Sequence, residues 1–411
     1  MKNILNLIKI NFISIFKGMF ALNKKNQGLK FILMSLLLLG IIYFAFGTMM
    51  NSFAEILVEL DAMNYLLFLS SIFSFVFVLF FITYEAQSYF FKTKDFELLS
   101  SLPIKKHEIV IAKYTSVLLS AYIYSSLIMI PSIIVYFMYV PFNFGLFMLY
   151  VLGFLFSPLV PMALGTVFGL IVSLITSKLK HSNIISIILF LLLFVAYFVI
   201  YFYMNSFVNN IVINGENLIK TMQYYLPSVA WFYTGFVQMN VLFIILDIIL
   251  NVLITVIAIV LLTITYKKIN QNLIKKKSAK THSLTFNKKS TIRSYLKIEA
   301  KRFISYPTYV LNSTFSLLFT IFVPFLLKFA IFNGTNEEIF AESEALFIII
   351  PTMLICINSM FAGISNTTSS SISIEGKQIQ LLKSLPLKPS KIFFTKILFN
   401  NLIVIPFIFI S

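Results

Sequence analysis

Residues 96–113 read FELLSSLPIKKHEIVIAK, and a related stretch, IQLLKSLPLKPSKIFFTK, occupies residues 379–396. A shift of 283 positions aligns the two stretches with 8 identities in a window of 16 residues. Leucines, a serine, a proline and lysines are shared, and each stretch borders long apolar runs. We name these stretches the first island and the second island. Their similarity indicates a duplicated chain in which each half carries one polar island.

The composition predicts a membrane protein. Of the 411 residues, 59% are hydrophobic and 11% are charged, whereas about a quarter of the residues in an ordinary soluble domain are charged. The apolar residues come in runs of roughly 20, the length with which a helix spans the bilayer core. The sequence therefore predicts an all-α polytopic membrane protein.

The first half, residues 1–266, is predicted to begin with an amphipathic helix. Residues 4–20 place polar and apolar side chains on opposite helical faces, which suits a helix lying in the membrane interface. Six membrane spans are expected to follow, at about residues 31–50, 64–84, 114–139, 146–176, 184–204 and 240–266.

The second half, residues 292–411, follows a basic cytoplasmic linker at residues 267–291. It is predicted to begin with a second amphipathic helix and to continue with spans at about residues 309–332, 345–365 and 397–411. Because four spans follow the first island, we expect a twelve-span protein whose second half is incomplete in this sequence. Six spans separate the islands, so the two halves are expected to be parallel.

The net charge of +17 comes from lysines in the connections on one side of the membrane, the pattern of cytoplasmic loops. Glu55, Glu59 and Asp61 stand in a connection without lysine and mark the outer side. We therefore expect the N-terminus and both islands to be cytoplasmic. The basic loops would attract anionic lipid, and no nucleic-acid partner is expected.

The sequence contains no recognised catalytic or metal-binding pattern. A phosphate-binding loop, H-E-x-x-H, C-x-x-C and G-x-S-x-G are all missing. The histidines, at positions 107, 181 and 282, stand far apart in basic segments. We therefore expect no catalytic residue, no metal site and no hydrolysis of ATP by this chain alone.

Two ionisable residues fall inside predicted spans, where a charge costs several kcal/mol and usually has a function. Asp247 lies in the outer third of the sixth span and Lys328 near the outer end of the seventh. The two could form an intramembrane pair that lines a cavity. Alternatively, Lys328 extends its amine to the interface and Asp247 faces water.

The fourth predicted span contains Pro158, Pro161 and the motif Gly165-x-x-x-Gly169. Proline kinks a membrane helix, and small residues four apart allow close helix contact. The motif is typical of ordinary helix packing, and a gating hinge is the alternative.

The islands are the candidates for a docking surface. Leu98, Leu99 and Leu102 could form one apolar face of a short helix that ends before Pro103. Such a helix, lying across the membrane surface, can offer its leucines to a groove in a partner. A plain basic turn is the alternative, but a turn has no need to repeat its apolar residues.

These residues resemble the permease subunits of ABC-type exporters, specifically the large duplicated bacterial exporter permeases. The resemblance is carried by Glu97 to Ile104 with Lys113, and by Leu381 to Leu387 with Lys396. It implies that each island is a coupling helix that docks into a dimer of separate ABC ATPase subunits. The docking residues implied are Glu97, Leu98, Leu99, Leu102, Pro103, Lys105, Leu381, Leu382, Leu385, Pro386 and Lys388. Gln380 stands where the first island has Glu97, so the acidic residue could matter on one side only.

We therefore expect the membrane-spanning permease subunit of an ATP-driven exporter in the bacterial cytoplasmic membrane. This chain would bind no cofactor, and ATP and magnesium would bind to the partner ATPase. One alternative is an ion- or proton-driven secondary transporter, which also suits parallel halves. The spans, however, lack the several buried acids or bases of a proton relay. The other alternative is a non-transporting membrane scaffold or sensor partner.

Overall fold

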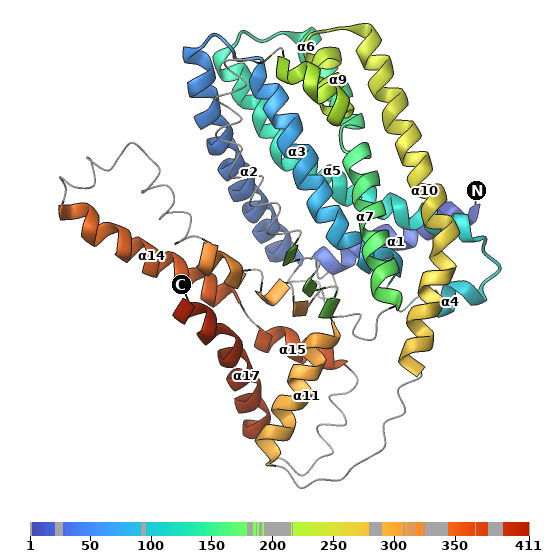
Figure 1. Cartoon of the computed structure of the whole chain (residues 1–411), viewed down its shortest axis with the longest axis vertical. Coiled ribbons are helices and arrows are strands. Elements are labelled where there is room, and N and C mark those ends of the chain that lie inside the picture. Colours follow the sequence, from blue (N-terminus) through green and yellow to red (C-terminus); the bar gives the residue numbers. More distant parts are fainter. Residues whose placement is uncertain are drawn as a thin grey trace. The chain divides into compact units, whose positions relative to one another are not determined.

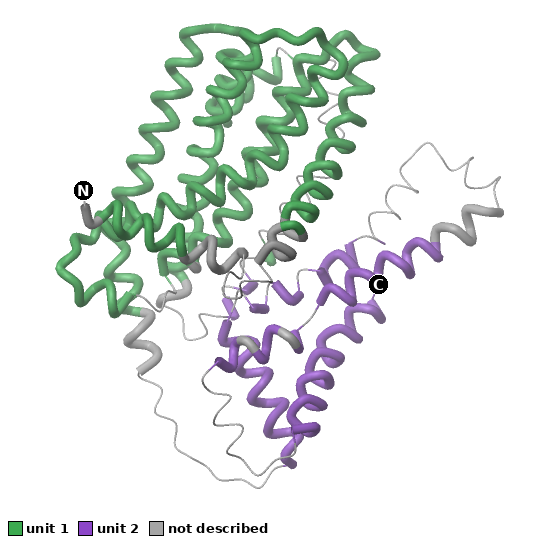
Figure 2. The backbone as a smooth tube through the Cα atoms, turned by 180° about the vertical axis from the view of Figure 1, so that it is seen from behind, with its two compact units in different colours: residues 1–180, 189–281 green, residues 181–188, 282–411 purple. Residues whose placement is uncertain are grey.

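The computed structural model divides into two compact units, which are described separately (Figure 2). Unit 1 contains Met1–Lys180 and Leu189–Thr281, and unit 2 contains His181–Ile188 and His282–Ser411. Every element of the described residues is helical, as the sequence predicts. The described residues are 2–20, 28–91, 96–178, 184–185, 187–188, 191–192, 215, 217–278, 290–306, 309–310, 312–314, 316–322, 324, 344–365, 367–376 and 389–410.

Unit 1 is a bundle of long helices with shorter elements at its two ends (Figure 1). Helices α2, α3, α5, α7 and α10 run side by side, and the amphipathic α1 crosses one end of the bundle. The elements are α1 (Lys2–Phe20), α2 (Gly28–Glu59), α3 (Tyr65–Ala86), the π-helical turn η1 (Gln87–Phe91), α4 (Phe96–Ser101), α5 (Lys106–Tyr139), α6 (Phe144–Phe156), α7 (Leu159–Lys178), α9 (Pro227–Phe232), the π-helical turn η2 (Tyr233–Val237) and α10 (Val241–Ser278).

Among the described residues, six helical segments are long and apolar enough to cross a membrane. Five lie in unit 1, where α2, α3, α5, the pair α6–α7 and α10 coincide with predicted spans. The sixth, α17 (Pro389–Ile410), lies in unit 2. Most of the span predicted at 184–204 falls outside the described residues, and so does the end of the span predicted at 309–332, after residue 324.

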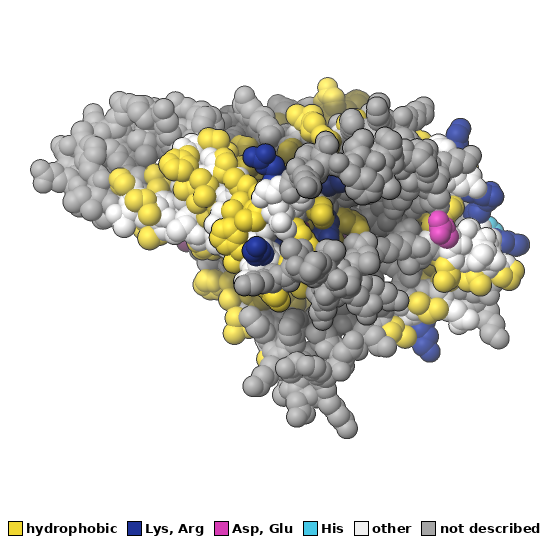
Figure 3. Space-filling model, turned by 90° about the horizontal axis from the view of Figure 1, so that it is seen from below, with side chains coloured by type: hydrophobic (Ala, Val, Ile, Leu, Met, Phe, Trp, Pro, Cys, Tyr) yellow, Lys and Arg dark blue, Asp and Glu magenta, His cyan; other side chains and the backbone are white. Residues whose placement is uncertain are grey.

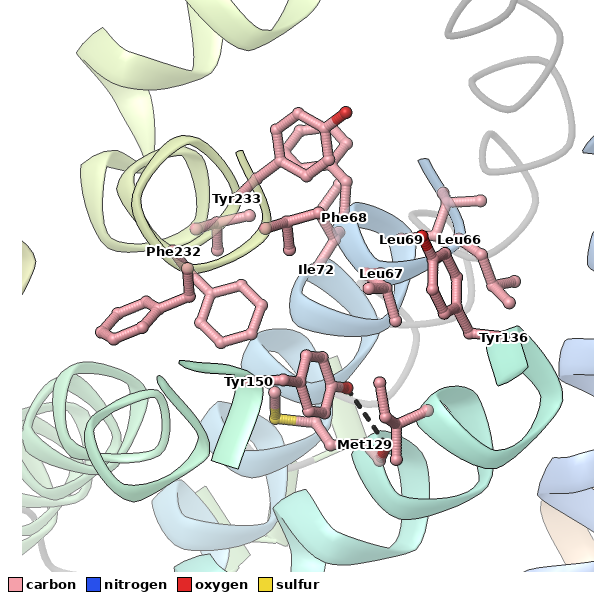
Figure 4. Close-up of a cluster of buried hydrophobic side chains, with 14 of the residues drawn as sticks. Leu66, Leu67, Phe68, Leu69, Ile72, Met129, Tyr136, Tyr150, Phe232 and Tyr233 are labelled. Atoms are coloured by element: carbon pink, nitrogen blue, oxygen red, sulfur yellow. Dashed lines mark hydrogen bonds between the residues drawn. The ribbon is translucent and has the colours of Figure 1, made fainter. Parts of the chain in front are cut away.

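The core of unit 1 forms around the N-terminal half of α3 (Figure 4). Phe68 of α3 packs against Tyr233 of η2 with ring centroids 5.3 Å apart, and Phe232 of α9 packs against Tyr150 of α6 at 5.6 Å. The Tyr150 hydroxyl donates a hydrogen bond of 3.1 Å to the carbonyl oxygen of Met129 in α5. Its polar end is therefore satisfied inside an apolar cluster.

Small residues bring α3 and α7 close together. A Cβ atom added to Gly165 would lie 3.1 Å from the Ile82 side chain and from the Leu79 carbonyl oxygen. One added to Gly169 would lie 2.8 Å from the Cβ atom of Ala86. The predicted Gly-x-x-x-Gly motif is thus a helix-packing contact.

The predicted fourth span, residues 146–176, is broken into α6 and α7 at Ser157 and Pro158. Pro158 and Pro161 have no backbone N–H to donate to the preceding turn, so the helix is interrupted there. The N–H group of Val160, near the start of α7, instead donates to Oδ1 of Asn251 in α10 at 3.3 Å. A side chain of the neighbouring helix therefore caps the break.

Unit 2 contains the amphipathic α11 (Thr291–Ser305), followed by α14 (Glu344–Ile364), α15 (Thr367–Glu375) and α17. Helix α11 packs against α17 through a small aromatic cluster in which Phe303 contacts Tyr309 and Phe399. In unit 1 the amphipathic α1 packs in the same way on the start of α5. The duplication read from the islands therefore extends to the helices around them.

Candidate functional site

The first island contains the short helix α4, whose inner side is fixed to the bundle. Phe96 is 7% exposed and packs edge-on against Tyr266 of α10, with ring centroids 5.6 Å apart. Leu99 and Ile104 are half-buried against the same cluster. An aromatic anchor at the first residue, with apolar contacts behind it, sets how α4 lies on unit 1.

Two leucines are exposed at α4. Leu98, in the helix, is 64% exposed, and Leu102, which directly follows the last residue of the helix, is 44% exposed. The single apolar face expected for Leu98, Leu99 and Leu102 is therefore divided, because consecutive helical residues point about 100° apart. Glu97, Pro103 and Lys105 are exposed beside the leucines.

Local hydrogen bonds fix both ends of the island. The hydroxyl groups of Ser100 and Ser101 donate to the carbonyl oxygens of Glu97 and Leu98, at 2.9 and 2.8 Å. The Lys105 N–H donates to Oε2 of Glu108 at 3.0 Å, which caps the start of α5. These contacts define the path of the chain around Pro103.

Basic side chains border this surface. Lys105, Lys106 and His107 are exposed where α5 begins. On the face shown in Figure 3, lysine and arginine side chains gather at one edge beside hydrophobic ones. An apolar ridge with a positive border would complement an apolar groove that carries acidic residues.

Lys113, the last residue of the first island, points into unit 1. It is 7% exposed, and its Nζ atom donates to the carbonyl oxygen of Tyr89 at 2.9 Å. Nδ2 of Asn270, in α10, donates to the next carbonyl oxygen, that of Phe90, at 3.0 Å. The π-helical turn η1, just before the island, is thus tied to α5 and α10. Lys113 is a candidate from the sequence because the second island has a lysine at the equivalent position. The sequence does not show, however, that its side chain points into the bundle.

The second island cannot be compared directly, because residues 377–388 lie outside the described residues. Leu381, Leu382, Leu385, Pro386 and Lys388 belong to that range. Its last residue, Lys396, is described and is 3% exposed.

Lys396 is the centre of a buried ionic cluster in unit 2. Its Nζ atom lies 2.7 Å from Oε1 of Glu375, 2.9 Å from Oε1 of Glu299 and 2.9 Å from Oγ of Ser371. Arg302 contacts the same two carboxylate oxygens, at 2.8 Å for Glu375 and 3.0 Å for Glu299. We name Glu299, Arg302, Glu375 and Lys396 the charge cluster. It joins α11, α15 and α17.

Lys113 and Lys396 have equivalent roles in the two units. Each is the last residue of its island, lies in the helix that begins within that island, and bonds to the segment that precedes the island. The amphipathic helices take part as well: Nδ2 of Asn11 donates to the carbonyl oxygen of Ala112 at 3.2 Å, and Glu299 accepts from Lys396. Each of the two repeated lysines is therefore buried within its own unit, whereas Leu98 and Leu102 of the first island are exposed.

The burial of Asp247 is at odds with exposure to water, one of the two hypotheses from the sequence, and its pairing with Lys328 stays a prediction. Asp247 is 1% exposed, so it does not face water, and its Oδ1 atom accepts a hydrogen bond of 3.0 Å from Nδ2 of Asn251. Lys328, the other member of the suggested pair, lies outside the described residues. In the part of the chain that is described, no group of three or more His, Cys, Asp or Glu side chains could hold a metal ion.

Comparison with known proteins agrees with this architecture. A family model described as membrane proteins of 12 transmembrane segments matches residues 29–411. No curated protein and no solved structure matches the chain. The family match includes both islands, the charge cluster and Asp247. The chain therefore belongs to the family of membrane proteins with twelve transmembrane segments.

Proposed function

We propose that this chain is the permease subunit of an ATP-driven ABC exporter, and that the first island docks into a separate ATPase subunit. The observation that carries the proposal is the short helix α4, which is anchored by Phe96 and leaves Leu98 and Leu102 exposed. Two exposed leucines on a polar connection offer an apolar contact that a groove in a partner could bury.

The anchoring contacts would transmit movement from the ATPase to the spans. Phe96 lies against α10 through Tyr266, and Lys113 links α5 to η1. A push on α4 would therefore act on α10, on α5 and, through η1, on α3. Closure of an ATPase dimer could in this way tilt several spans together and alternate access to a cavity between them.

The chain would perform no chemistry itself. ATP and magnesium would bind to the ATPase partner, and the permease would contribute conformational change in the bacterial cytoplasmic membrane. The lysines beside the first island favour a cytoplasmic location for α4 and for the N-terminus.

The double substitution Leu98→Asp/Leu102→Asp tests the docking role. We expect the amount of ATPase subunit that co-purifies with the tagged double variant to be more than about tenfold below that of the wild type. A tenfold loss of affinity corresponds to only about 1.4 kcal/mol, and burying two carboxylates without partners costs more. The measurement is the amount of ATPase subunit recovered with the tagged chain from membranes of the native host.

The matched control is Ser100→Asp, which adds a carboxylate to an exposed position of the same helix. Because it also removes the hydrogen bond from the Ser100 hydroxyl to the Glu97 carbonyl oxygen, Ser100→Ala is measured beside it. Both should retain the partner at the wild-type level. Size-exclusion chromatography in detergent verifies that each variant is folded. A folded double variant that retains its ATPase at the wild-type level would show that α4 is not the docking surface.

A carrier driven by an ion gradient is the second candidate. One observation favours it, the carboxyl group of Asp247 buried inside a span. Wild-type membranes that yield no ATPase subunit with the tagged chain would favour this candidate over the first.

A further inference from the structure

Asp247 carries the only carboxyl group on α6, α7, α9, η2 and α10. Its Oδ1 atom accepts a hydrogen bond from Asn251, but Oδ2 is buried and has no hydrogen-bond partner among the described residues. Asn251 is itself completely buried. Half of this carboxyl group is therefore unsatisfied inside the bundle.

Among the described residues, the elements packed around Asp247 offer it no positive charge. Helices α6 and α9 and the turn η2 contain no lysine or arginine, and the single lysine of α7, Lys178, is its last residue. Lys178 lies roughly 27 Å along the helix from Val160 at 1.5 Å per residue. In α5 the basic residues stop at Lys113, and in α10 they begin at Lys267. The other titratable groups on the surrounding elements are neutral tyrosines, together with His107 and Glu108 at the same end of α5 as Lys113.

A buried carboxyl group in this position is better accommodated as the neutral acid. Removing an ionised carboxylate from water is very costly without a paired charge and several donors, and a neutral acid avoids most of that cost. Asp247 has one donor to Oδ1. Its surroundings therefore favour a bound proton.

Asp247 is also connected, through Asn251, to the break between α6 and α7. Asn251, which donates to Asp247, accepts the Val160 N–H group at the break between α6 and α7. If the break shifted relative to α10, Asn251 would lose Val160 and the carboxyl group would become accessible to water. In membrane proteins, broken helices often line ion sites, because the backbone groups at the break can be rearranged.

Polar groups continue from Asp247 toward the cytoplasmic end of α10. Asn251 and Thr255 follow at intervals of four residues and so occupy the same side of the helix. The buried hydroxyl group of Tyr114, from α5, lies beside Thr255 and beside Thr166 of α7. Buried polar groups thus lie on this side of α10, but the hydroxyl groups of Thr255 and Tyr114 have no hydrogen-bond partner among the described residues, so they form no connected path for a proton.

We infer that Asp247 is a proton-binding site, which holds a proton in this conformation and exchanges it when the α6–α7 break moves away from α10. The ligand is a single proton, and Asn251 is the positioning residue that links its uptake to the helix break. This inference does not depend on an ATPase partner, so it can fail or succeed separately from the docking proposal.

The first test is labelling of the full-length chain in proteoliposomes with dicyclohexylcarbodiimide, an apolar reagent that adds to protonated carboxyl groups. Mass spectrometry of the digested chain should find the adduct at Asp247. The matched controls are Glu55 and Glu59, which are exposed carboxylates of α2 and should be labelled at least tenfold less. The second test is infrared spectroscopy, in which the carbonyl stretching band of a protonated carboxyl group should be present in the wild type and lost in Asp247→Asn.

Either the adduct at Asp247 or loss of the infrared band in Asp247→Asn would support a bound proton. If neither signal depends on Asp247, the carboxyl group is ionised and the inference is wrong. Labelling that appears only after Lys328→Met would also overturn it, because Lys328 would then be the cation that keeps Asp247 ionised.

Discussion

Replacing Lys396 by methionine is expected to lower the free energy of unfolding by about 3–5 kcal/mol, the usual cost of removing one partner from a buried ion pair. The charge cluster is neutral, with two carboxylates and two basic groups. Without Lys396 it carries a net charge of −1. Arg302 would then be the one basic group of the charge cluster left for both Glu299 and Glu375. Water cannot compensate, because the side chain of Glu375 is 2% exposed and that of Glu299 is 6% exposed.

Thermal unfolding in detergent measures this effect. The matched control is Lys391→Met, which removes a lysine from an exposed position of the same helix and should leave the melting temperature nearly unchanged. A second variant, Lys396→Met/Glu375→Gln, restores neutrality and should recover part of the loss. Equal shifts for Lys396→Met and Lys391→Met would show that the charge cluster does not stabilise unit 2.

The long helices are the part of the fold that sequence predicts well. Runs of roughly 20 apolar residues identify a span because the bilayer core requires that length. Their ends were less accurate. The predicted span at 240–266 belongs to a helix, α10, that continues to Ser278. Lysine and asparagine residues end an apolar run without ending the helix. Hydropathy therefore locates the membrane boundary and not the helix terminus.

The direction of individual side chains could not be predicted. Lys113 and Lys396 belong to a basic surface by composition, yet both are buried, because each satisfies its amine within its own unit. Asp247 was placed in a span from the sequence. Its separation from the basic side chains of the described residues, however, depends on which faces of α6 and α7 pack against α10. A single sequence shows which residues are present, but it does not show which helices pack against each other and so bring those residues into contact.

Replacing Gly169 by leucine is expected to lower the free energy of unfolding by about 3 kcal/mol, at the upper end of what overpacking usually costs. A Cβ atom at position 169 would lie 2.8 Å from that of Ala86 and 3.1 Å from the carbonyl oxygen of Thr83. Neither neighbour is a flexible side chain, so α3 and α7 would have to separate. Because Ala86 directly precedes η1, the separation would also disturb the turn that Lys113 holds beneath the first island.

The matched control for this substitution is Gly40→Leu in α2, where an added Cβ atom has no neighbour within 4 Å. Both substitutions replace glycine in a helix and gain a similar helix propensity of up to about 1 kcal/mol, so this contribution cancels in the comparison. Thermal unfolding in detergent should separate the two variants clearly, and Gly169→Ala should fall between them. If Gly169→Leu melts at the same temperature as Gly40→Leu, α3 and α7 do not make the close contact on which the base of the first island rests.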